Sequence, residues 1–344
     1  MSQSGVTVEK AGAPFTVVND LPRSSPGAKQ ALVKSVYVAL NPVETVMQKY
    51  GVLVQDWPAV LGSDFCAQVI ETGPECTKLK KGDYVYSECR LGQKAYSPFQ
   101  ETFLVDEDYV FKVEGELTPA QASTIAVGTL TSAFGIIVGA KVPLPEPGTK
   151  VAEKDEWLIV LGGSGTVGHY AIQIGRLCGY KVAASCSPSN KSVVLKLGAQ
   201  AAINNRGTPE EQAAEVQSIT GGKYSIVFDA SALSNKAAAK MLEASTASPK
   251  YYTTSEANHY DMPDGVTSYY VLIGKLGQDD DLGKHVSEET KKMIPSLQGH
   301  VASGVLTPLE YEVYNGTGFE SLATALTDFG EGKIKGKMVI RLQD

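Results

Sequence analysis

The sequence has few of the features that are typical of nucleic-acid-binding, membrane or secreted proteins. Its 31 Lys and Arg residues face 38 Asp and Glu, and the net charge of −7 repels phosphate backbones and anionic lipid headgroups. We find no apolar stretch of the roughly 18 residues that a membrane span needs. The first residues, MSQSGVTVEKAG, lack a basic start followed by an apolar core. We therefore expect a cytoplasmic protein with neither nucleic acid nor membrane as partner.

Clustered metal ligands are also missing from the sequence. Its five cysteines and four histidines are scattered, without a CxxC pair, an HExxH motif or two histidines one helical turn apart. An odd number of cysteines in a large chain without a secretory signal indicates reduced thiols. We expect neither disulfides nor a bound metal.

What is present is a change of pattern along the chain. Up to about Gly115, short β-branched runs alternate with turn residues, which predicts a small β-rich unit. A helix-like stretch of small residues follows at 118–137, and the prolines within 142–156 predict an exposed loop. After about Gly274 the pattern predicts helices at 287–301 and 318–329 and a final strand at 337–342.

Between these parts the sequence predicts alternating strands and helices. WLIVLGG, from Trp157, is a continuous apolar run that ends in glycine, as a strand buried on both faces would be. The next segment has apolar residues at helical spacing, with Gly179 as its stop. KVAASCS, SNKSVVLKLGA and YSIVFDAS then predict a strand, a helix and a further strand after an acidic helix. This order indicates an α/β fold with a doubly wound parallel sheet.

A GxGxxG motif lies at the first turn from strand to helix in this region. Gly163 would permit the tight turn, Gly165 would let the backbone reach a pyrophosphate, and Gly168 would let helix and strand pack closely. The helix N-terminus favours an anion. The motif therefore predicts a dinucleotide site at Gly163, Ser164, Gly165, Thr166 and Val167.

The end of the second strand favours NADPH over NADH. An NADH site usually has an acidic residue there for the ribose hydroxyl, whereas this chain has Ser185, Cys186 and Ser187 and no acid at all between residues 158 and 209. Ser187 and Asn190 can donate hydrogen bonds to a 2′-phosphate and Lys191 can add charge. The alternative that Lys191 is only a solvated helix residue stays open. Five basic residues lie in this stretch: Arg176, Lys181, Lys191, Lys196 and Arg206.

Six strings of this sequence resemble the medium-chain dehydrogenase/reductase superfamily in that family's order. The resemblance implies a GroES-like catalytic domain from both chain ends, residues 1–125 and 276–344, and a Rossmann domain that binds NADPH at 126–275. The six strings are ALNPVET (39–45), LGSDFCAQV (61–69), KKGDYVY (80–86), AVGTLTSA (126–133), LGGSGTVGHYAIQ (161–173) and GKMVIRL (336–342).

Within that superfamily the chain resembles a zinc-free branch. Zinc-dependent members have a cysteine where Asn41 stands and a His-Glu pair where Ser63 and Asp64 stand. The zinc-free branch includes quinone reductases of the zeta-crystallin type and enoyl reductases. NPVET is similar to the quinone reductases, while GYKVAASCSPSN (179–190) is similar to fungal enoyl reductases of the lovastatin type, which act in trans on polyketide synthases.

The resemblance also implies roles for single residues. Thr131 matches a threonine near the nicotinamide, and Thr131 and Asn41 are the candidate catalytic donors of hydrogen bonds. Val46 stands where the lovastatin-type enzyme has a lysine near the cofactor. The cofactor phosphate would lie at Ser187, Asn190 and Asn205, the last in place of a tyrosine of that enzyme.

The leading hypothesis is an NADPH-dependent enoyl reductase, an enzyme that reduces the C=C bond of an α,β-unsaturated thioester or ester by hydride transfer without a metal. Its substrate would be a polyketide-type intermediate, free or on a polyketide synthase that acts as a partner in trans. Two alternatives stay open. One is an NADPH-dependent reductase of quinones or small enones, and the other is a cofactor-binding protein without turnover.

Overall fold

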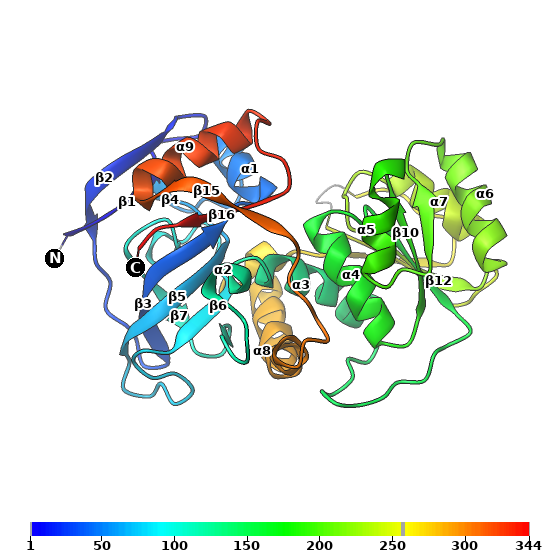
Figure 1. Ribbon diagram of the computed structural model, residues 1–344, viewed down its shortest axis with the longest axis horizontal. Coiled ribbons are helices and arrows are strands. Elements are labelled where there is room, and N and C mark those ends of the chain that lie inside the picture. The colour runs from blue at the N-terminus through cyan, green and yellow to red at the C-terminus, as the bar shows by residue number, and fades with distance from the viewer. Residues whose placement is uncertain (1, 256–258, 344) are drawn as a thin grey trace. The chain divides into compact units, whose positions relative to one another are not determined.

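The computed structural model describes residues 2–255 and 259–343, and the chain divides into two compact units (Figure 1). The first unit contains Met1–Val127, Gly274–Gln298 and Thr307–Asp344, and the second contains Gly128–Ile273 and Gly299–Leu306. The first unit is thus assembled from both ends of the chain.

The first unit is built on two β-sheets that are mostly antiparallel. Its seven-stranded sheet has the order β15-β16-β3-β5-β6-β8, with β7 also paired to β3, and its three-stranded sheet has the order β2-β1-β4. Alternate apolar side chains of these strands form one buried core. The strands are β1 (Ser2–Val8), β2 (Phe15–Pro22), β3 (Gln30–Ala39), β4 (Ala59–Val60), β5 (Asp64–Thr72), β6 (Tyr84–Glu88), β7 (Thr102–Asp106), β8 (Phe111–Lys112), β15 (Tyr311–Thr317) and β16 (Lys337–Arg341).

Helices of this unit begin and end at residues with clear capping chemistry. Helix α1 (Pro42–Tyr50) follows Asn41, whose backbone N–H donates to the Glu44 carboxylate, and it stops at Gly51 with φ of 69°. Helix α9 is Gly318–Gly330, α2 is Pro119–Ala122, and the short turns η1 and η4 are Lys94–Tyr96 and Ile273–Lys275. Helix α8 (Asp281–Ala302) starts earlier than the predicted 287, because the Asp280 carboxylate accepts from the Gly283 N–H at its first turn.

The second unit contains a six-stranded parallel sheet of order β11-β10-β9-β12-β13-β14. In chain order these strands are 3-2-1-4-5-6, the doubly wound arrangement, so the predicted α/β fold class is confirmed. The prediction missed β11, a strand of four residues whose sequence AAIN has little β character. The strands are β9 (Trp157–Leu161), β10 (Lys181–Cys186), β11 (Ala201–Asn204), β12 (Tyr224–Asp229), β13 (Lys250–Thr254) and β14 (Val266–Tyr270).

Helices cover both faces of this parallel sheet (Figure 1). On one face, Ala213 and Val216 of α6 and Met241 of α7 share a core with Ile159 of β9. On the other face, a Cβ at Gly175 of α4 would lie 3.0 Å from Val182 of β10. The helices are α3 (Ala126–Ala133), the π-helix η2 (Phe134–Gly139), α4 (Thr166–Leu177), η3 (Pro188–Asn190), α5 (Lys191–Lys196), α6 (Pro209–Thr220) and α7 (Asn235–Ala244).

One apolar run corrects the sequence analysis. The helical run Pro119–Gly139 has 21 residues and a mean hydropathy of 1.6, enough to cross a membrane by length and composition, so the statement that no stretch is long enough was wrong. Its apolar window is 83% buried inside the protein. It is therefore core material and not a membrane span.

Candidate functional site

The glycine-rich turn after β9 requires glycine for reasons that differ from position to position. Gly162, just before the motif, has φ of 78°, so Gly162 and not Gly163 is the left-handed residue of the tight turn. A Cβ at Gly163 would lie 2.8 Å from Ala184, and one at Gly168 would lie 2.2 Å from the Gly162 carbonyl oxygen. These two glycines allow helix α4 to pack closely against the sheet.

Packing among the described residues does not require glycine at position 165, because a Cβ there would meet only the Gly162 oxygen, at 3.5 Å. Gly165 is also the N-cap of α4, and no side chain in the described part of the chain caps this helix. Helix α6 differs, since Thr208 and Glu211 form a complete capping box at its start. The first turn of α4 thus offers its backbone N–H groups and open space to an anion.

The residues predicted for the cofactor phosphate lie together at the ends of β10 and β11. Asn190 Nδ2 donates to Ser164 Oγ at 3.2 Å, which joins this group to the glycine-rich turn. Ser187 Oγ lies 2.9 Å from Ser189 Oγ, and the Asn205 N–H donates to the Cys186 carbonyl at 3.1 Å. Lys191 is exposed at the start of α5. The second unit therefore brings all nine predicted cofactor residues to one edge of its sheet.

Thr131, the predicted catalytic residue of the second unit, lies on a helix that packs against the start of α4. Ser132 Oγ donates to the Val167 carbonyl at 2.7 Å, and a Cβ at Gly128 would lie 2.9 Å from the Thr166 methyl. Thr131 itself is only 4% exposed. These contacts fix its helix next to the glycine-rich turn.

A loop at the end of β12 also belongs to this edge. The buried Asp229 carboxylate accepts from the Ser231 and Ser234 N–H groups, and Ser231 lies against Gly162 of the glycine-rich turn. The loop exposes 87% of Leu233 beside the switch point of the strand order. The signal in the sequence was the string DASALS, which has a turn-forming Asp directly after a strand.

Asn41, the predicted catalytic residue of the first unit, lies in a buried polar network. Its Nδ2 donates to Ser63 Oγ and to Asp64 Oδ2, both at 2.9 Å, and its Oδ1 accepts from Lys337 Nζ at 2.7 Å. Lys337 Nζ also pairs with Asp64 Oδ2 at 2.7 Å, where both side chains are 1% exposed or less. Ser63 Oγ donates to Glu44. Both amide hydrogens of Asn41 are thus engaged inside the protein.

Lys337 is the member of this network that the sequence analysis missed. It lies on β16, 296 residues after Asn41, and the sequence indicates only that it begins a final strand. Its ammonium group brings positive charge to the side chains of Asn41 and Asp64. The described residues contain no group of three or more His, Cys, Asp or Glu that is arranged to hold a metal ion.

Burial sets the protonation of two carboxyls next to this network. Desolvation raises the pKa of Glu44 to about 7, opposed by its hydrogen bonds from Ser63 and Asn41. Desolvation, with repulsion from Asp64 and Glu44, raises the pKa of Glu88 well above its usual range. Burial thus favours the protonated form of both carboxyls.

All five cysteines lie in the described part of the chain, and each is a free thiol. Cys66 is fully buried in β5, and burial raises the pKa of its thiol, so it is packing material and not a nucleophile.

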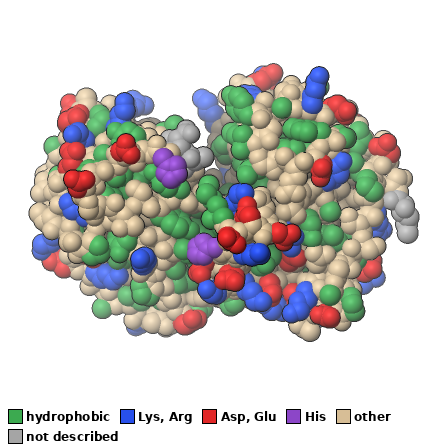
Figure 2. All heavy atoms as spheres, turned by 180° about the vertical axis from the view of Figure 1, so that it is seen from behind, with side chains coloured by type: hydrophobic (Ala, Val, Ile, Leu, Met, Phe, Trp, Pro, Cys, Tyr) green, Lys and Arg blue, Asp and Glu red, His purple; other side chains and the backbone are tan. Residues whose placement is uncertain are grey.

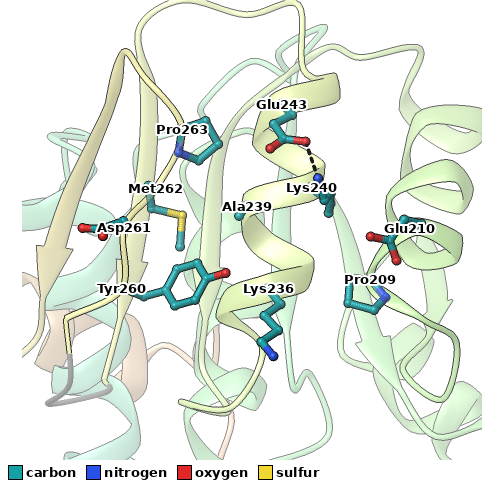
Figure 3. Close-up of a pocket in the computed structure, with 10 residues that line it drawn as sticks. All are labelled: Pro209, Glu210, Lys236, Ala239, Lys240, Glu243, Tyr260, Asp261, Met262 and Pro263. Carbon is teal, nitrogen blue, oxygen red and sulfur yellow. Dashed lines mark hydrogen bonds and ion pairs between the residues drawn. The ribbon is translucent and has the colours of Figure 1, made fainter.

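The second unit also has a surface pocket that none of the predicted site residues lines. A pocket of about 350 Å³ in the second unit lies between α6, α7 and residues 260–263, with Tyr260 and Met262 facing α7 (Figure 3). Its Lys240 pairs with Glu243 at 2.9 Å. Acidic and basic side chains are interspersed over the face shown in Figure 2.

Comparison with known proteins gives relatives for both units. Residues 27–115 match the alcohol dehydrogenase GroES-like domain. The trans-enoyl reductase traG of Penicillium crustosum is 32% identical over 68% of this chain and 64% of its own length, so the chain covers slightly less than two thirds of that relative. The dehydrogenase azaJ of Aspergillus niger is 26% identical over 95% of both chains.

Solved structures share the fold over the whole length. A putative zinc-dependent alcohol dehydrogenase of Rhizobium etli has a TM-score of 0.79 at 23% identity and covers 100% of this chain and 99% of its own. The CurK enoyl reductase has a TM-score of 0.76 at 19% identity, with 99% of each chain covered. At these identities the likeness shows the fold alone.

Proposed function

Because residues 27–115 match the alcohol dehydrogenase GroES-like domain and a trans-enoyl reductase is among the relatives, we propose that this chain is an NADPH-dependent enoyl reductase of the medium-chain dehydrogenase/reductase superfamily that works without a metal. Its substrate would be an α,β-unsaturated thioester or ester of the polyketide type. The observation that carries the proposal is the uncapped start of α4, next to a strand end that has hydroxyl, amide and ammonium groups in place of an acid.

The residues at the sheet edge fit a dinucleotide with a 2′-phosphate. The backbone N–H groups of the first α4 turn would bind the pyrophosphate, and Gly165 leaves room for it. Ser187, Asn190 and Lys191 would bind the 2′-phosphate, with Asn205 beside them. When bound, NADPH supplies a hydride to the β-carbon of the conjugated alkene.

Negative charge then builds on the carbonyl oxygen of the substrate, and without a metal it must be met by hydrogen-bond donors. We assign this role to the Thr131 hydroxyl and to backbone amides. Asn41 serves as a positioning residue, because Ser63 and Asp64 already accept its two N–H groups. Lys337 holds the Asn41 oxygen in place and keeps the network close to neutral.

The proposed partner is a polyketide synthase whose carrier domain presents the substrate in trans. The relative named as a trans-enoyl reductase supports this assignment. A cytoplasmic location is proposed because all five cysteines, each within the described residues, are free thiols.

Cofactor choice is tested by titrating the protein with NADPH and with NADH. Hydrogen bonds to the phosphate worth about 1.5 to 3 kcal/mol predict roughly ten- to a hundredfold tighter binding of NADPH. Ser187→Asp should reverse this preference through repulsion, while Ser218→Asp, on an exposed position of α6, is the matched control. Equal dissociation constants in the parent protein would exclude the phosphate site.

Substrate class is tested by supplying NADPH with a crotonyl-type thioester, a small enone and a quinone, and NADP⁺ with a primary alcohol. Reduction of the thioester supports the proposal, and reduction of the quinone alone favours the quinone reductase. Tight NADPH binding without oxidation on the whole panel indicates a binding protein. Activity confined to the alcohol contradicts all three.

A further inference from the structure

We propose that the pocket between α6, α7 and residues 260–263 is a binding site for a small aromatic carboxylate, such as a benzoate. The pocket lies wholly within the second unit, and none of the predicted cofactor residues lines it. The inference goes beyond the proposed reductase and does not depend on it.

A small residue on α7 creates the hollow. Lys236, Ala239 and Glu243 follow one another along one face of this helix, and the alanine leaves a depression between the longer side chains. Tyr260 and Met262 face α7 and form the opposite wall (Figure 3). The volume of about 350 Å³ is typical of small-molecule sites. At about 30 Å³ for each water-sized atom, the pocket holds on the order of ten non-hydrogen atoms.

The pocket walls are held in place without a ligand. The Tyr260 N–H donates to Tyr270 Oη at 3.1 Å, and the Tyr270 hydroxyl donates to the Tyr260 carbonyl at 3.3 Å, which anchors this segment on β14. Met262 packs against the core that α6 and α7 share with the sheet. On the α6 side, Pro209 follows the capping box that starts this helix. A ligand therefore meets a preformed site and loses little binding energy in ordering it.

The apolar part of the pocket suits a flat ring. Tyr260 contributes an aromatic ring, Met262 contributes a polarisable thioether, and Ala239 closes the floor with a methyl group. An aromatic ring and a thioether both attract a second aromatic ring beyond the gain from burying its area. A saturated ring of the same size gains only the burial. The pocket therefore favours an aromatic ring over an aliphatic one.

The charged side chains around the pocket leave one ammonium group for a ligand. Lys240 pairs with Glu243 at 2.9 Å, and this carboxylate, with Glu210 further off, raises the pKa of Lys240. The Asp261 carboxylate points away from α7 (Figure 3). Lys236, near the start of α7, makes no hydrogen bond or ion pair with any described residue. The free positive charge therefore lies at one end of the pocket.

These groups determine how a carboxylate ligand would lie. Tyr260 lies at the same end of the pocket as Lys236 (Figure 3), and its hydroxyl has no hydrogen-bond partner in the described part of the chain. The ligand carboxylate would accept from this hydroxyl and from the Lys236 ammonium group. Its ring would then lie between Met262 and Ala239, while Glu243 repels the anionic end from the opposite side. A neutral ligand of the same shape would gain nothing from Lys236.

Binding is measured by NMR of the full-length protein labelled with ¹³C at the methionine methyl groups. The chain has six methionines, and Met262→Leu assigns the signal of Met262. The probes are benzoate, benzyl alcohol and cyclohexanecarboxylate, which are similar in size and differ in charge or in aromaticity. We expect benzoate to shift the Met262 signal in a saturable way, and each of the other two probes to bind about threefold to fivefold more weakly. A Met262 signal that benzoate does not move, or equal binding of either other probe, overturns the inference.

Two variants with matched controls test the site itself. Ala239→Leu fills the floor and should weaken benzoate binding at least tenfold, while Ala244→Leu, at an exposed position of the same helix, should bind like the parent. Lys236→Gln, at an exposed position that does not endanger folding, should weaken binding about fivefold, and Lys150→Gln, an exposed lysine outside the pocket, is its control. Equal losses in Lys236→Gln and Lys150→Gln overturn the inference. Displacement of benzoate by NADPH also overturns it, because the anion would then occupy the cofactor site.

Discussion

Glu44→Gln gives a direct test of the buried network, because it removes one titrating group and keeps its shape. The Gln side chain still accepts from the Asn41 N–H and can donate to Ser63 Oγ. In the parent, burial raises the pKa of Glu44 from 4.5 to about 7. Below pH 4.5 the carboxyl is protonated in both the folded and unfolded chain, and above about pH 7 it is ionised in both.

The size of the effect follows from this difference. Between pH 4.5 and 7 the unfolded chain releases the proton of Glu44 and the folded chain keeps it, so folding becomes less favourable as pH rises. A shift of 7 − 4.5 = 2.5 pKa units corresponds to about 3 kcal/mol in the free energy of unfolding. Glu44→Gln should therefore gain about 3 kcal/mol relative to the parent between pH 4.5 and pH 7.5.

The assay is urea unfolding followed by tryptophan fluorescence at a series of pH values. The chain has two tryptophans, Trp57 in the first unit and Trp157 in the second, so a Trp157→Phe background reports on the first unit alone. Glu71→Gln, at an exposed position of β5, is the control. A stability difference between Glu44→Gln and its parent that stays constant across pH 5 to 7.5 would show that the Glu44 pKa is not raised in the folded protein.

Two further predictions concern the glycine-rich turn and the ion pair. Gly168→Ala should lower the melting temperature of the second unit, because its Cβ would lie 2.2 Å from the Gly162 carbonyl oxygen. Gly165→Ala should leave the melting temperature nearly unchanged and weaken NADPH binding. Equal thermal effects of the two variants would contradict this prediction. Lys337→Met should cost about 3 to 5 kcal/mol in urea unfolding, because it leaves the Asp64 carboxylate buried and unpaired. Addition of Asp64→Asn should recover part of that loss, and strictly additive effects would show that the pair is not coupled.

The second unit was largely predictable because its signals are local. Three signals lie within some thirty residues: the apolar run before Gly162, the helical spacing after it, and Ser187 in place of an acid. The structure brings these segments to one edge of the sheet. Even so, the left-handed turn residue is Gly162 and not Gly163, since φ depends on the packing of β9 against the loop after β12.

The network of the first unit was not predictable in the same way. Asn41, Ser63 and Lys337 meet through pairing of β3 with β5 and β16, and no spacing in the sequence indicates that contact. Glu88 gave no signal either, because an acid at the end of a short strand usually faces solvent. Its burial follows from the register that sets it opposite Asp64.

The proposed reaction transfers a hydride from NADPH to the β-carbon of a conjugated alkene. The most direct measurement uses NADPH deuterated at the transferred C4 position with a crotonyl-type thioester, and NMR of the product. We expect one deuterium at the β-carbon and a solvent-derived hydrogen at the α-carbon. A recovered thioester with its C=C bond intact while NADPH binds, or deuterium found only in a reduced carbonyl group, would contradict it.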